Sequence, residues 1–348
     1  MLDVVADGLC MKKLIYNGQT YPLDPAKSVL DNLLAAGINI PYSCRTGICQ
    51  SCILQKVAGE IDDESQHGLR EALALQHYFK TCSAFCDNDI ELTSGKRADY
   101  LGRAVITRKR ILNNRVCLLE IEPANPVYYH AGQFMNFRRH DGETRSYSIA
   151  SLPSRAGALE FHIERMRNGT LSNWLFDEAQ VGDSIDIQGP YGRSFYRTTA
   201  NEMSLLLVAN GCALAPALGV VRDALDSGFK GQIYLYHGSN DLDGLYFHQQ
   251  LLSMDDAVDN FHYRACLDDP SQVRDDLPAG YYQGNVAKLA LARFTHLQAF
   301  KVFLFGDPQM VRNAKEVALN AGALPANVLI DPFDYRDLRK EKRPKSAA

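Results

Sequence analysis

The spacing of hydrophobic and polar positions changes along the chain and predicts three regions of different structure. In the first region, apolar residues recur at helical spacing over 29–34, with Ser28 as a candidate N-cap and Gly37 just beyond the end. From about Arg97, short β-type segments alternate with glycine, proline and asparagine. The clearest of these segments are 102–108, 116–122 and 133–137. Many short strands separated by turn residues predict a small β-barrel.

The third region begins near position 200, where strongly apolar segments alternate with helical ones. Strands are expected at 205–209, 232–237 and 302–305, and helices up to about Ser227 and near 246–252. This alternation predicts a doubly wound α/β domain with a parallel sheet, whose ligands bind at the carboxyl ends of the strands. The most apolar stretch, 205–221, contains Asn210, Gly211 and Pro216, which predict a strand, a loop and a helix rather than a membrane span.

Length and composition agree with several domains and exclude some classes of protein. A chain of 348 residues is longer than the roughly 250–300 residues that one hydrophobic core supports. With 46% hydrophobic and 22% charged residues, the chain is not disordered as a whole. Its 37 basic and 41 acidic residues leave a net charge of −4, which argues against a nucleic-acid-binding protein.

The negative charge is concentrated at the N-terminal end. Residues 1–95 hold 7 Lys or Arg against 12 Asp or Glu, whereas the remaining 253 residues hold 30 against 29. This shift in composition predicts that the first 95 residues form a module of their own. The module contains the acidic run 60–64, which we interpret either as a solvated loop or as a docking surface for a basic partner.

The chain contains nine cysteines, and an odd number in a long chain disfavours a secreted disulfide scaffold. The segment from Met1 to Cys10 also lacks the basic and then apolar pattern of a secretion signal. We therefore expect a cytoplasmic protein without a transmembrane segment, in which some cysteines bind metal or take part in redox chemistry.

Cys44, Cys49 and Cys52 follow a C-x4-C-x2-C spacing, and 29 residues separate Cys52 from Cys82. Thiolates are soft ligands that select zinc, Cu(I) or iron–sulfur clusters. Structural zinc sites usually contain two separated short pairs, which this chain lacks, whereas the observed spacing is that of plant-type [2Fe–2S] clusters. Gly47 allows the loop to turn tightly, and the loop amides can donate hydrogen bonds to the sulfur atoms.

The residues around these cysteines match a known family. The matching positions are Ser28-Val29-Leu30-Asp31, Gly37, Pro41-Tyr42-Ser43-Cys44-Arg45, Gly47, Cys49, Cys52, Thr81-Cys82 and Asp89-Ile90-Glu91-Leu92. Together they resemble the plant-type ferredoxin module, which implies a β-grasp fold and a [2Fe–2S] cluster bound by the four cysteines of the motif. Cys86 is the alternative fourth ligand, but the interval and the strand that follows match the family at Cys82. The remaining cysteines are expected to be small buried hydrophobic residues; they are Cys10, Cys117, Cys212 and Cys266.

The barrel region contains a second candidate cofactor site. Arg145-Ser146-Tyr147-Ser148 falls in a predicted strand, and Asn168-Gly169-Thr170-Leu171-Ser172 precedes an amphipathic helix whose N-terminus can bind a pyrophosphate. Gly182-Asp183 and Gly189-Pro190-Tyr191-Gly192 follow. This ordered set resembles the flavin-binding domain of the ferredoxin–NADP reductase superfamily, which is a six-stranded antiparallel β-barrel.

This resemblance implies roles for individual residues of the flavin site. Arg145 would pair with the flavin phosphate, Tyr147 would pack against the isoalloxazine ring, and Ser148 would form a hydrogen bond near the reactive flavin nitrogen. Ser146 belongs to the same binding strand. A guanidinium group suits a phosphate and an aromatic face suits a planar ring, so the chemistry agrees with the resemblance. The pyrophosphate would be bound by Gly169, Thr170, Leu171 and Ser172.

The third region resembles the nucleotide-binding domain of the same superfamily, with departures at two motifs. The family loop G-G-T-G-x-A-P appears here as Asn210-Gly211-Cys212-Ala213-Leu214-Ala215-Pro216, so Ala213 adds a side chain where the nucleotide approaches the backbone. The later family pattern C-G-x-P-x-M appears as Phe305-Gly306-Asp307-Pro308-Gln309-Met310. By this resemblance the dinucleotide is bound by Gly211, Cys212, Pro216, Gly238, Gly306, Asp307, Pro308 and Met310.

Two aromatic residues are candidates for catalytic positions beside Tyr147 and Ser148. Phe305 stands where the family places a cysteine beside the nicotinamide, and it either displaces that ring or stacks on it. Phe333, in Asp331-Pro332-Phe333, stands where a terminal aromatic residue of the family covers the flavin. An ordinary buried phenylalanine explains Phe333 equally well.

The residues after the second strand of this region favour NADH over NADPH. The family often has Gly-x-Arg there, and this chain has Gly238-Ser239-Asn240-Asp241. No arginine or lysine stands nearby in the sequence to pair with a 2′-phosphate, and Asp241 and Asp243 would repel one.

The order ferredoxin, flavin, nucleotide resembles the reductase components of bacterial multicomponent oxygenases, such as the benzoate dioxygenase, methane monooxygenase and phenol hydroxylase reductases. The implied domains are 12–95, 97–199 and 200–333, followed by a basic tail, 334–348. By this resemblance a monomer takes electrons from NADH and passes them through FAD and a [2Fe–2S] cluster to a terminal oxygenase or hydroxylase. The N-terminal position of the ferredoxin favours FAD over FMN. The alternatives are an electron carrier or redox module with impaired NAD(P)H use, and a reductase for a sugar-deoxygenating or desaturating enzyme.

Overall fold

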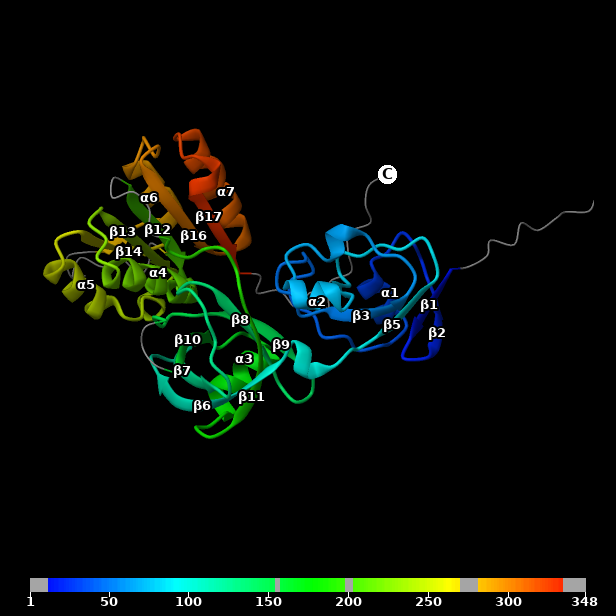
Figure 1. The fold of residues 1–348 in the computed structure, drawn as a ribbon. Coiled ribbons are helices and arrows are strands. Elements are labelled where there is room, and N and C mark those ends of the chain that lie inside the picture. The colour runs from blue at the N-terminus through cyan, green and yellow to red at the C-terminus, as the bar shows by residue number, and fades with distance from the viewer. Residues whose placement is uncertain (1–11, 154–156, 198–202, 270–280, 334–348) are drawn as a thin grey trace, which may run out of the picture. The chain divides into compact units, whose positions relative to one another are not determined.

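The computed structural model describes residues 12–153, 157–197, 203–269 and 281–333, and these contain three β-sheets (Figure 1). The described residues form two compact units. The first unit comprises those within 1–102 and 138–144, and the second comprises those within 103–137 and 145–348. The five-stranded sheet belongs to the first unit, and the two six-stranded sheets belong mainly to the second.

The first unit contains a mixed sheet and two short helices. Its strands run in the order β2-β1-β5-β3-β4, with β1 parallel to β5 and antiparallel to β2. The predicted helix is present as α1, whose N-cap Ser28 accepts a hydrogen bond from the Asp31 amide over 3.1 Å. Leu14, Leu30 and Phe79 are fully buried in its core. The elements are β1 Lys13–Tyr16, β2 Gln19–Pro22, α1 Val29–Ala35, β3 Ile53–Ala58, α2 Glu71–Leu75, β4 Tyr78–Lys80 and β5 Ile90–Thr93.

The second sheet is the predicted barrel. Its strands run in the order β10-β7-β6-β11-β8-β9, and a bridge between Ile149 and Phe161 joins the two ends of this order. The Ala150 amide donates to the Glu160 carbonyl over 2.8 Å at the same seam, so the sheet closes on itself. The strands are β6 Gly102–Ile111, β7 Val116–Pro123, β8 Phe134–Arg138, β9 Thr144–Ser148, β10 Leu159–Glu164 and β11 Ser184–Tyr191. Helix α3, Thr170–Asn173, continues as a π-helical turn, Trp174–Glu178.

The third sheet is parallel and lies between helices, as the alternating pattern predicts (Figure 1). Its strand order is β15-β14-β13-β12-β16-β17, so β13 to β15 lie on one side of β12, and β16 and β17 lie on the other. The carboxyl ends of β12 and β16 therefore form the switch point at which this fold class binds ligands. The elements are β12 Ser204–Asn210, α4 Leu214–Asp226, β13 Ile233–Ser239, α5 His248–Ala257, β14 Phe261–Leu267, β15 Tyr281–Gln283, α6 Val286–Arg293, β16 Phe300–Gly306, α7 Pro308–Asn320 and β17 Val328–Pro332.

The three predicted fold classes are confirmed, although the hydrophobic pattern did not single out every strand. β15 and β17 contain few fully buried residues, so their hydrophobic signal is weak. Among the described residues, every helix is too short or too polar to cross a lipid bilayer. The predicted basic tail, 334–348, lies outside the described residues.

Candidate cofactor sites

The four predicted cluster ligands lie as two pairs in the first unit. The Cys44 amide donates to the Cys49 sulfur over 3.5 Å, and the Cys49 amide donates to the Cys44 sulfur over 3.3 Å. The side chains of Cys52 and Cys82 form a hydrogen bond with each other. A two-iron cluster takes two thiolates on each iron, so this pairing fits it. In the described part of the chain, no three His, Cys, Asp or Glu side chains are placed to hold a single metal ion.

The loop that carries Cys44 supplies hydrogen bonds that favour thiolates. The Cys49 side chain and the amides of Thr46 and Cys49 lower the pKa of Cys44 to about 5. The hydrogen bond from Cys52 lowers the pKa of Cys82, and the Gly47 amide adds to this effect. Gly47 has a φ of +76°, a conformation that glycine adopts without strain, and this turn directs its amide inward.

Cys86 lies in the same buried core as Cys52 and Cys82. Burial raises the pKa of the Cys86 thiol to about 11, and the charges of Asp62 and Asp87 act in the same direction. Cys82 interacts with Cys52 and stays the predicted fourth ligand, with Cys86 as the alternative. Cys117 and Cys266 are buried, as expected, and Cys10 lies outside the described residues.

The predicted flavin-binding strand is β9. Ser146 Oγ donates to Asn136 Oδ1 over 2.8 Å, which orients the strand against β8. The Tyr147 ring packs against Phe137 with 5.2 Å between centroids. Arg145 is partly exposed and Ser148 is buried, so a basic group lies at the surface and a hydroxyl group lies below it.

The predicted pyrophosphate segment begins helix α3. Gly169 is its N-cap and Thr170 is exposed, so these two positions are open to a ligand. Leu171 is almost fully buried in the barrel core, and Ser172 Oγ accepts a hydrogen bond from the Met166 amide over 3.4 Å. The side chains of Leu171 and Ser172 therefore fix the helix in place, while Thr170 at its start is exposed to the solvent.

Asp331, to which no sequence motif gives a role, lies beside the predicted flavin-binding strand. The Ser148 hydroxyl forms a hydrogen bond with the Asp331 carboxyl group, which stands near the carboxyl end of β17. Burial raises the pKa of Asp331 to about 7, and the Ser148 hydrogen bond opposes this shift only in part. A carboxyl group that titrates near neutrality beside a buried hydroxyl is a candidate proton donor.

The predicted dinucleotide-binding segments meet at the switch point of the third sheet. A Cβ atom on Gly306, at the end of β16, would lie 3.2 Å from the Asn210 Cβ at the end of β12. The Phe333 amide donates to the Gly306 carbonyl over 2.6 Å, so Phe333 lies beside the same point. Asp307 caps α7 by accepting hydrogen bonds from the amides of Gln309 and Met310, with Pro308 in the first turn. Pro216 is buried inside helix α4.

Cys212 and Gly238 serve the packing of this domain. The Cys212 thiol donates to the His162 carbonyl over 3.0 Å, so its side chain faces the barrel. A Cβ atom on Gly238 would lie 2.5 Å from the Val286 Cβ, so glycine is required there for α6 to approach β13. The backbone of the Cys212 loop, rather than its side chain, is therefore what the loop offers to a ligand.

The Glu164 carboxylate lies beside a backbone amide of this loop. Its carboxylate accepts a hydrogen bond from the Cys212 amide, and its Oε2 lies 3.9 Å from a Cβ atom built on Gly211. Burial raises the pKa of Glu164, whereas the charge of Arg115 opposes the shift. A carboxylate at a loop amide competes with a phosphate for that donor.

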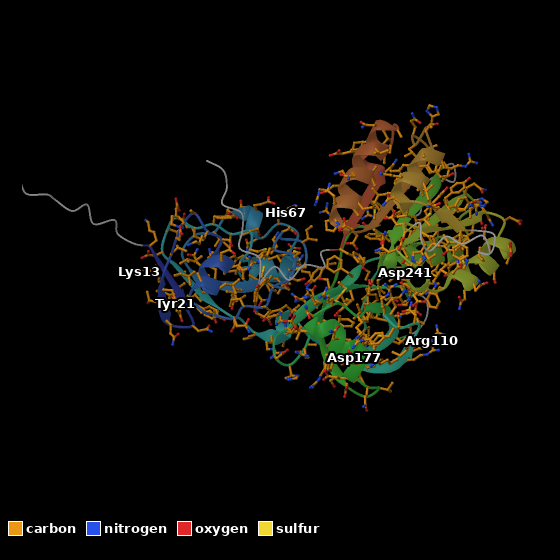
Figure 2. All side chains as sticks on the ribbon, turned by 180° about the vertical axis from the view of Figure 1, so that it is seen from behind. Lys13, Tyr21, His67, Arg110, Asp177 and Asp241 are labelled. Carbon is orange, nitrogen blue, oxygen red and sulfur yellow. The ribbon has the colours of Figure 1, made fainter. Side chains whose placement is uncertain are left out.

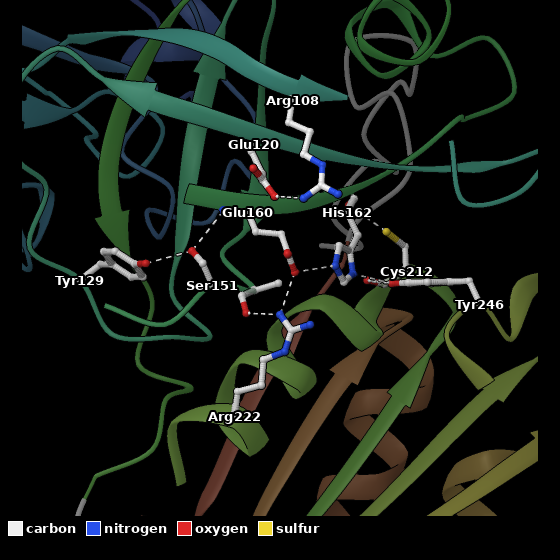
Figure 3. Close-up of polar contacts among 10 residues, drawn as sticks. Arg108, Glu120, Tyr129, Ser151, Glu160, His162, Cys212, Arg222 and Tyr246 are labelled. Carbon is white, nitrogen blue, oxygen red and sulfur yellow. Dashed lines mark hydrogen bonds and ion pairs between the residues drawn. The ribbon is translucent and has the colours of Figure 1, made fainter. Parts of the chain in front are cut away.

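A buried polar network connects the barrel with the loop (Figure 3). His162 Nδ1 lies 3.0 Å from the Tyr246 hydroxyl, and His162 Nε2 lies 3.2 Å from Glu160 Oε1. Arg222 donates to the same Glu160 oxygen over 2.8 Å, and Tyr246 donates to the Cys212 carbonyl over 3.4 Å. Burial lowers the pKa of His162, so the ring is neutral at pH 7. The network holds the loop against the barrel through hydrogen bonds at both ends of the His162 ring.

No basic residue stands near Asp241 in the sequence, but the fold brings one to it. Arg115, in the turn between β6 and β7, forms an ion pair with Asp241, a residue labelled in Figure 2. Asn114 in the same turn donates to the Asp243 carboxylate over 3.0 Å. The barrel thus supplies a cation that is distant in sequence, and Asp241 is neutralised in part.

Phe305 lies in the hydrophobic core of the third domain and has no exposed surface. Its ring stacks beside Phe303 with 6.2 Å between centroids. No face of Phe305 is therefore open to a nicotinamide in this conformation.

Phe305→Cys is accordingly expected to lower the free energy of unfolding by about 2–4 kcal/mol, because it leaves a cavity, without speeding flavin reduction. Denaturant unfolding and stopped-flow mixing with NADH measure the two effects. Phe305→Leu, which retains most of the volume, is the control and should cost about 1 kcal/mol. Faster flavin reduction in the cysteine variant would instead show that Phe305 obstructs the nicotinamide.

Three protein-family models match the chain in the order of the three sheets. A 2Fe-2S iron-sulfur cluster binding domain matches residues 14–87. An oxidoreductase FAD-binding domain matches residues 104–196, and an oxidoreductase NAD-binding domain matches residues 207–316.

Two relatives span nearly the whole chain. The reductase component 2 of terephthalate 1,2-dioxygenase from Comamonas sp. is 28% identical over 321 residues, which cover 90% of this chain and 94% of that protein. The phenol hydroxylase P5 protein of Acinetobacter pittii (strain PHEA-2) is 27% identical over 328 residues, covering 91% and 92%. The crystal structure of the Amycolatopsis cytochrome P450 reductase matches with a TM-score of 0.64 and 22% identity, covering 92% of this chain and 98% of that one. At that identity the structural likeness concerns the fold alone.

Proposed function

Because the chain belongs to the family of three-domain electron-transfer reductases with 2Fe-2S, FAD-binding and NAD-binding domains, we propose that it supplies electrons from NADH to a partner oxygenase. The observation that carries the proposal is the contact between Ser148 and Asp331. It joins the flavin-binding strand to the end of the nucleotide-binding sheet, in a chain that also holds a paired set of four cysteines.

Each cofactor has residues that suit it. When bound, NADH supplies a hydride, FAD accepts both electrons and releases them singly, and the cluster carries one electron at a time. Arg145 and the first turn of α3 would bind the flavin phosphates, and Tyr147 would pack on its ring. Ser148 would donate its hydroxyl proton toward the flavin, with Asp331 holding a proton behind it. The cysteine pairs would hold the cluster.

NADH rather than NADPH is the proposed donor. Asp241 and Asp243 bring two carboxylates to the end of β13, and Arg115 balances one of them. Glu164 adds a further negative charge at the loop amide. A 2′-phosphate would meet more negative than positive charge in this region, whereas an aspartate can accept a hydrogen bond from a 2′-hydroxyl.

Anaerobic mixing tests the proposal. NADH is expected to bleach the flavin absorption band within seconds and then to reduce the cluster, and NADPH at the same concentration is expected to act at least tenfold more slowly. Stopped-flow absorbance follows both cofactors in the same protein sample.

A flavin that dithionite reduces but NADH does not would contradict the proposal. That result would favour an electron carrier with an impaired nucleotide site, for which the Glu164 carboxylate at the loop amide is the structural reason. Equal rates with NADH and NADPH would contradict the donor preference alone.

The partner is proposed to be an oxygenase or hydroxylase, by analogy with the terephthalate and phenol systems of the two relatives. The acidic run 60–64 is exposed except for Ile61, which is partly buried, so it is available to a basic surface of such a partner. We also propose a cytoplasmic location, because the paired cysteines require a compartment that keeps thiols reduced.

A further inference from the structure

Lys80 is a buried lysine at the end of β4, two positions before the cluster ligand Cys82. Only 5% of its surface is exposed. Two contacts fix this end of β4. Lys80 pairs with Ile53 in β3, and the Thr81 hydroxyl donates to the Cys52 carbonyl over 2.7 Å. The position of the lysine backbone is therefore tied to the cysteines.

The ammonium group of Lys80 has a single hydrogen-bond acceptor and no carboxylate partner among the residues that the structure describes. Nζ donates to the carbonyl of His67, labelled in Figure 2, over 2.6 Å. Burying a cation without an opposite charge is costly, so another interaction is needed to explain why lysine stands here.

The Lys80 ammonium lies next to the cluster-binding loop. A Cβ atom built on Gly47 would lie 3.5 Å from Lys80 Nζ. The Gly47 amide is one of the hydrogen-bond donors to the Cys82 sulfur. A single glycine thus stands between the buried positive charge and a cluster ligand.

We propose that Lys80 is a positioning residue whose charge raises the reduction potential of the [2Fe–2S] cluster. Reduction adds one negative charge to the cluster, and a fixed positive charge in a poorly solvated place stabilises the reduced form more than the oxidised form. A higher cluster potential draws electrons from the flavin. The inference rests on the cluster of the proposed function, but not on the identity of the electron donor or of the partner.

Lys80→Gln tests the proposal, because glutamine retains a donor for the His67 carbonyl and removes the charge. In the cluster-loaded protein, at a fixed potential set by a reference dye, the ratio of reduced to oxidised cluster is expected to fall at least tenfold. For a one-electron couple this is a shift of about 59 mV. Lys80→Arg is expected to stay within threefold of the wild type, since it retains the charge. Redox titration by visible absorption and electron paramagnetic resonance measures the ratio.

Two further variants complete the experiment. Lys80→Met removes both charge and donor and should match the glutamine variant. Lys27→Met is the control, because Lys27 is exposed and paired with Asp24, and its ratio should equal that of the wild type. Equal shifts in Lys80→Arg and Lys80→Gln would overturn the proposal and show that packing sets the potential. An unchanged ratio in Lys80→Gln would also overturn it.

Cluster loading separates this inference from the proposed function. A wild-type protein that binds no cluster would contradict the proposed function itself. Loss of the cluster in both charge-removing variants would overturn the tuning role, because it would make Lys80 a requirement for assembly. A loaded cluster with an unchanged potential would reject the role of Lys80 and leave the proposed function intact.

Discussion

Replacing Cys49 by serine is expected to remove the visible absorption of the [2Fe–2S] cluster while NADH still bleaches the flavin. Cys49 is paired with Cys44, and serine is a poor substitute for a thiolate ligand of iron. The flavin-binding and nucleotide-binding residues belong to the other compact unit. The variant should therefore retain flavin reduction within about twofold and lose more than about 95% of electron delivery to a one-electron acceptor protein. Absorption spectra and stopped-flow mixing measure the two steps.

Cys86→Ser is the matched control for this experiment. Cys86 lies four positions after Cys82 and is buried, but it is not paired with any of the four ligands. The control should retain the cluster spectrum. Loss of the cluster in Cys86→Ser together with its retention in Cys82→Ser would reverse the assignment of the fourth ligand. Loss of flavin reduction in Cys49→Ser would contradict the separation of the two steps.

The rate of flavin reduction by NADH is expected to fall as the pH rises through about 7, and Asp331→Asn is expected to abolish this dependence. The pKa of Asp331 is raised from 3.8 to about 7, so the carboxyl group holds a proton below neutral pH. It can then donate to Ser148 Oγ and leave the Ser148 hydroxyl proton free for the flavin. Above pH 7 the carboxylate instead accepts a hydrogen bond from the Ser148 hydroxyl group, which then no longer points to the flavin. Loss of a hydrogen-bond donor positioned at a site of developing charge typically costs about 10²-fold in rate.

The same titration acts on stability with a defined sign. Because the pKa of Asp331 is higher in the folded protein than in the unfolded chain, its stabilising contribution is fully present below pH 3.8. The contribution is lost as the pH rises through about 7. The midpoint of thermal unfolding of the cofactor-free protein should therefore decline between these values, and less so in Asp331→Asn.

Three variants make the pH experiment decisive. Asp331→Asn keeps a donor to Ser148 and should show the low-pH rate at every pH. Asp331→Leu cannot accept the Ser148 hydroxyl proton, so its rate should likewise not fall as the pH rises through about 7. Asp256→Asn changes an exposed carboxylate on α5 and should retain the wild-type profile. A profile with the same midpoint in Asp331→Asn would assign the titration to another group.

Local motifs made much of this protein predictable. The cluster ligands Cys44, Cys49 and Cys52 lie in one loop, so their spacing alone specifies the sulfur positions once the loop turns at Gly47. The barrel and the parallel sheet were predictable because the spacing of apolar residues differs between strands buried on one face and strands buried on both faces. Three contiguous segments of this kind suffice to recognise the three cofactor domains.

Other parts of the sites depend on residues that are far apart in the sequence. Phe305 occupies a family cysteine position, yet only the packing shows that its ring belongs to the core. The ion pair of Arg115 with Asp241 joins the barrel to the nucleotide-binding sheet, and no motif contains both residues. His162 likewise has no motif, and its role follows from neighbours on other elements.

The sequence by itself predicted the three cofactor domains, the cysteine set and the strand proposed to bind flavin, because each depends on residue types at short, fixed spacing. Only the tertiary structure decided that Asp331 lies against Ser148 and that the Lys80 ammonium lies against the cluster loop. These contacts depend on how separate elements pack, and no spacing of residues in the sequence indicates that packing. The charge environment of both redox sites, and hence their chemistry, is therefore a property of the fold.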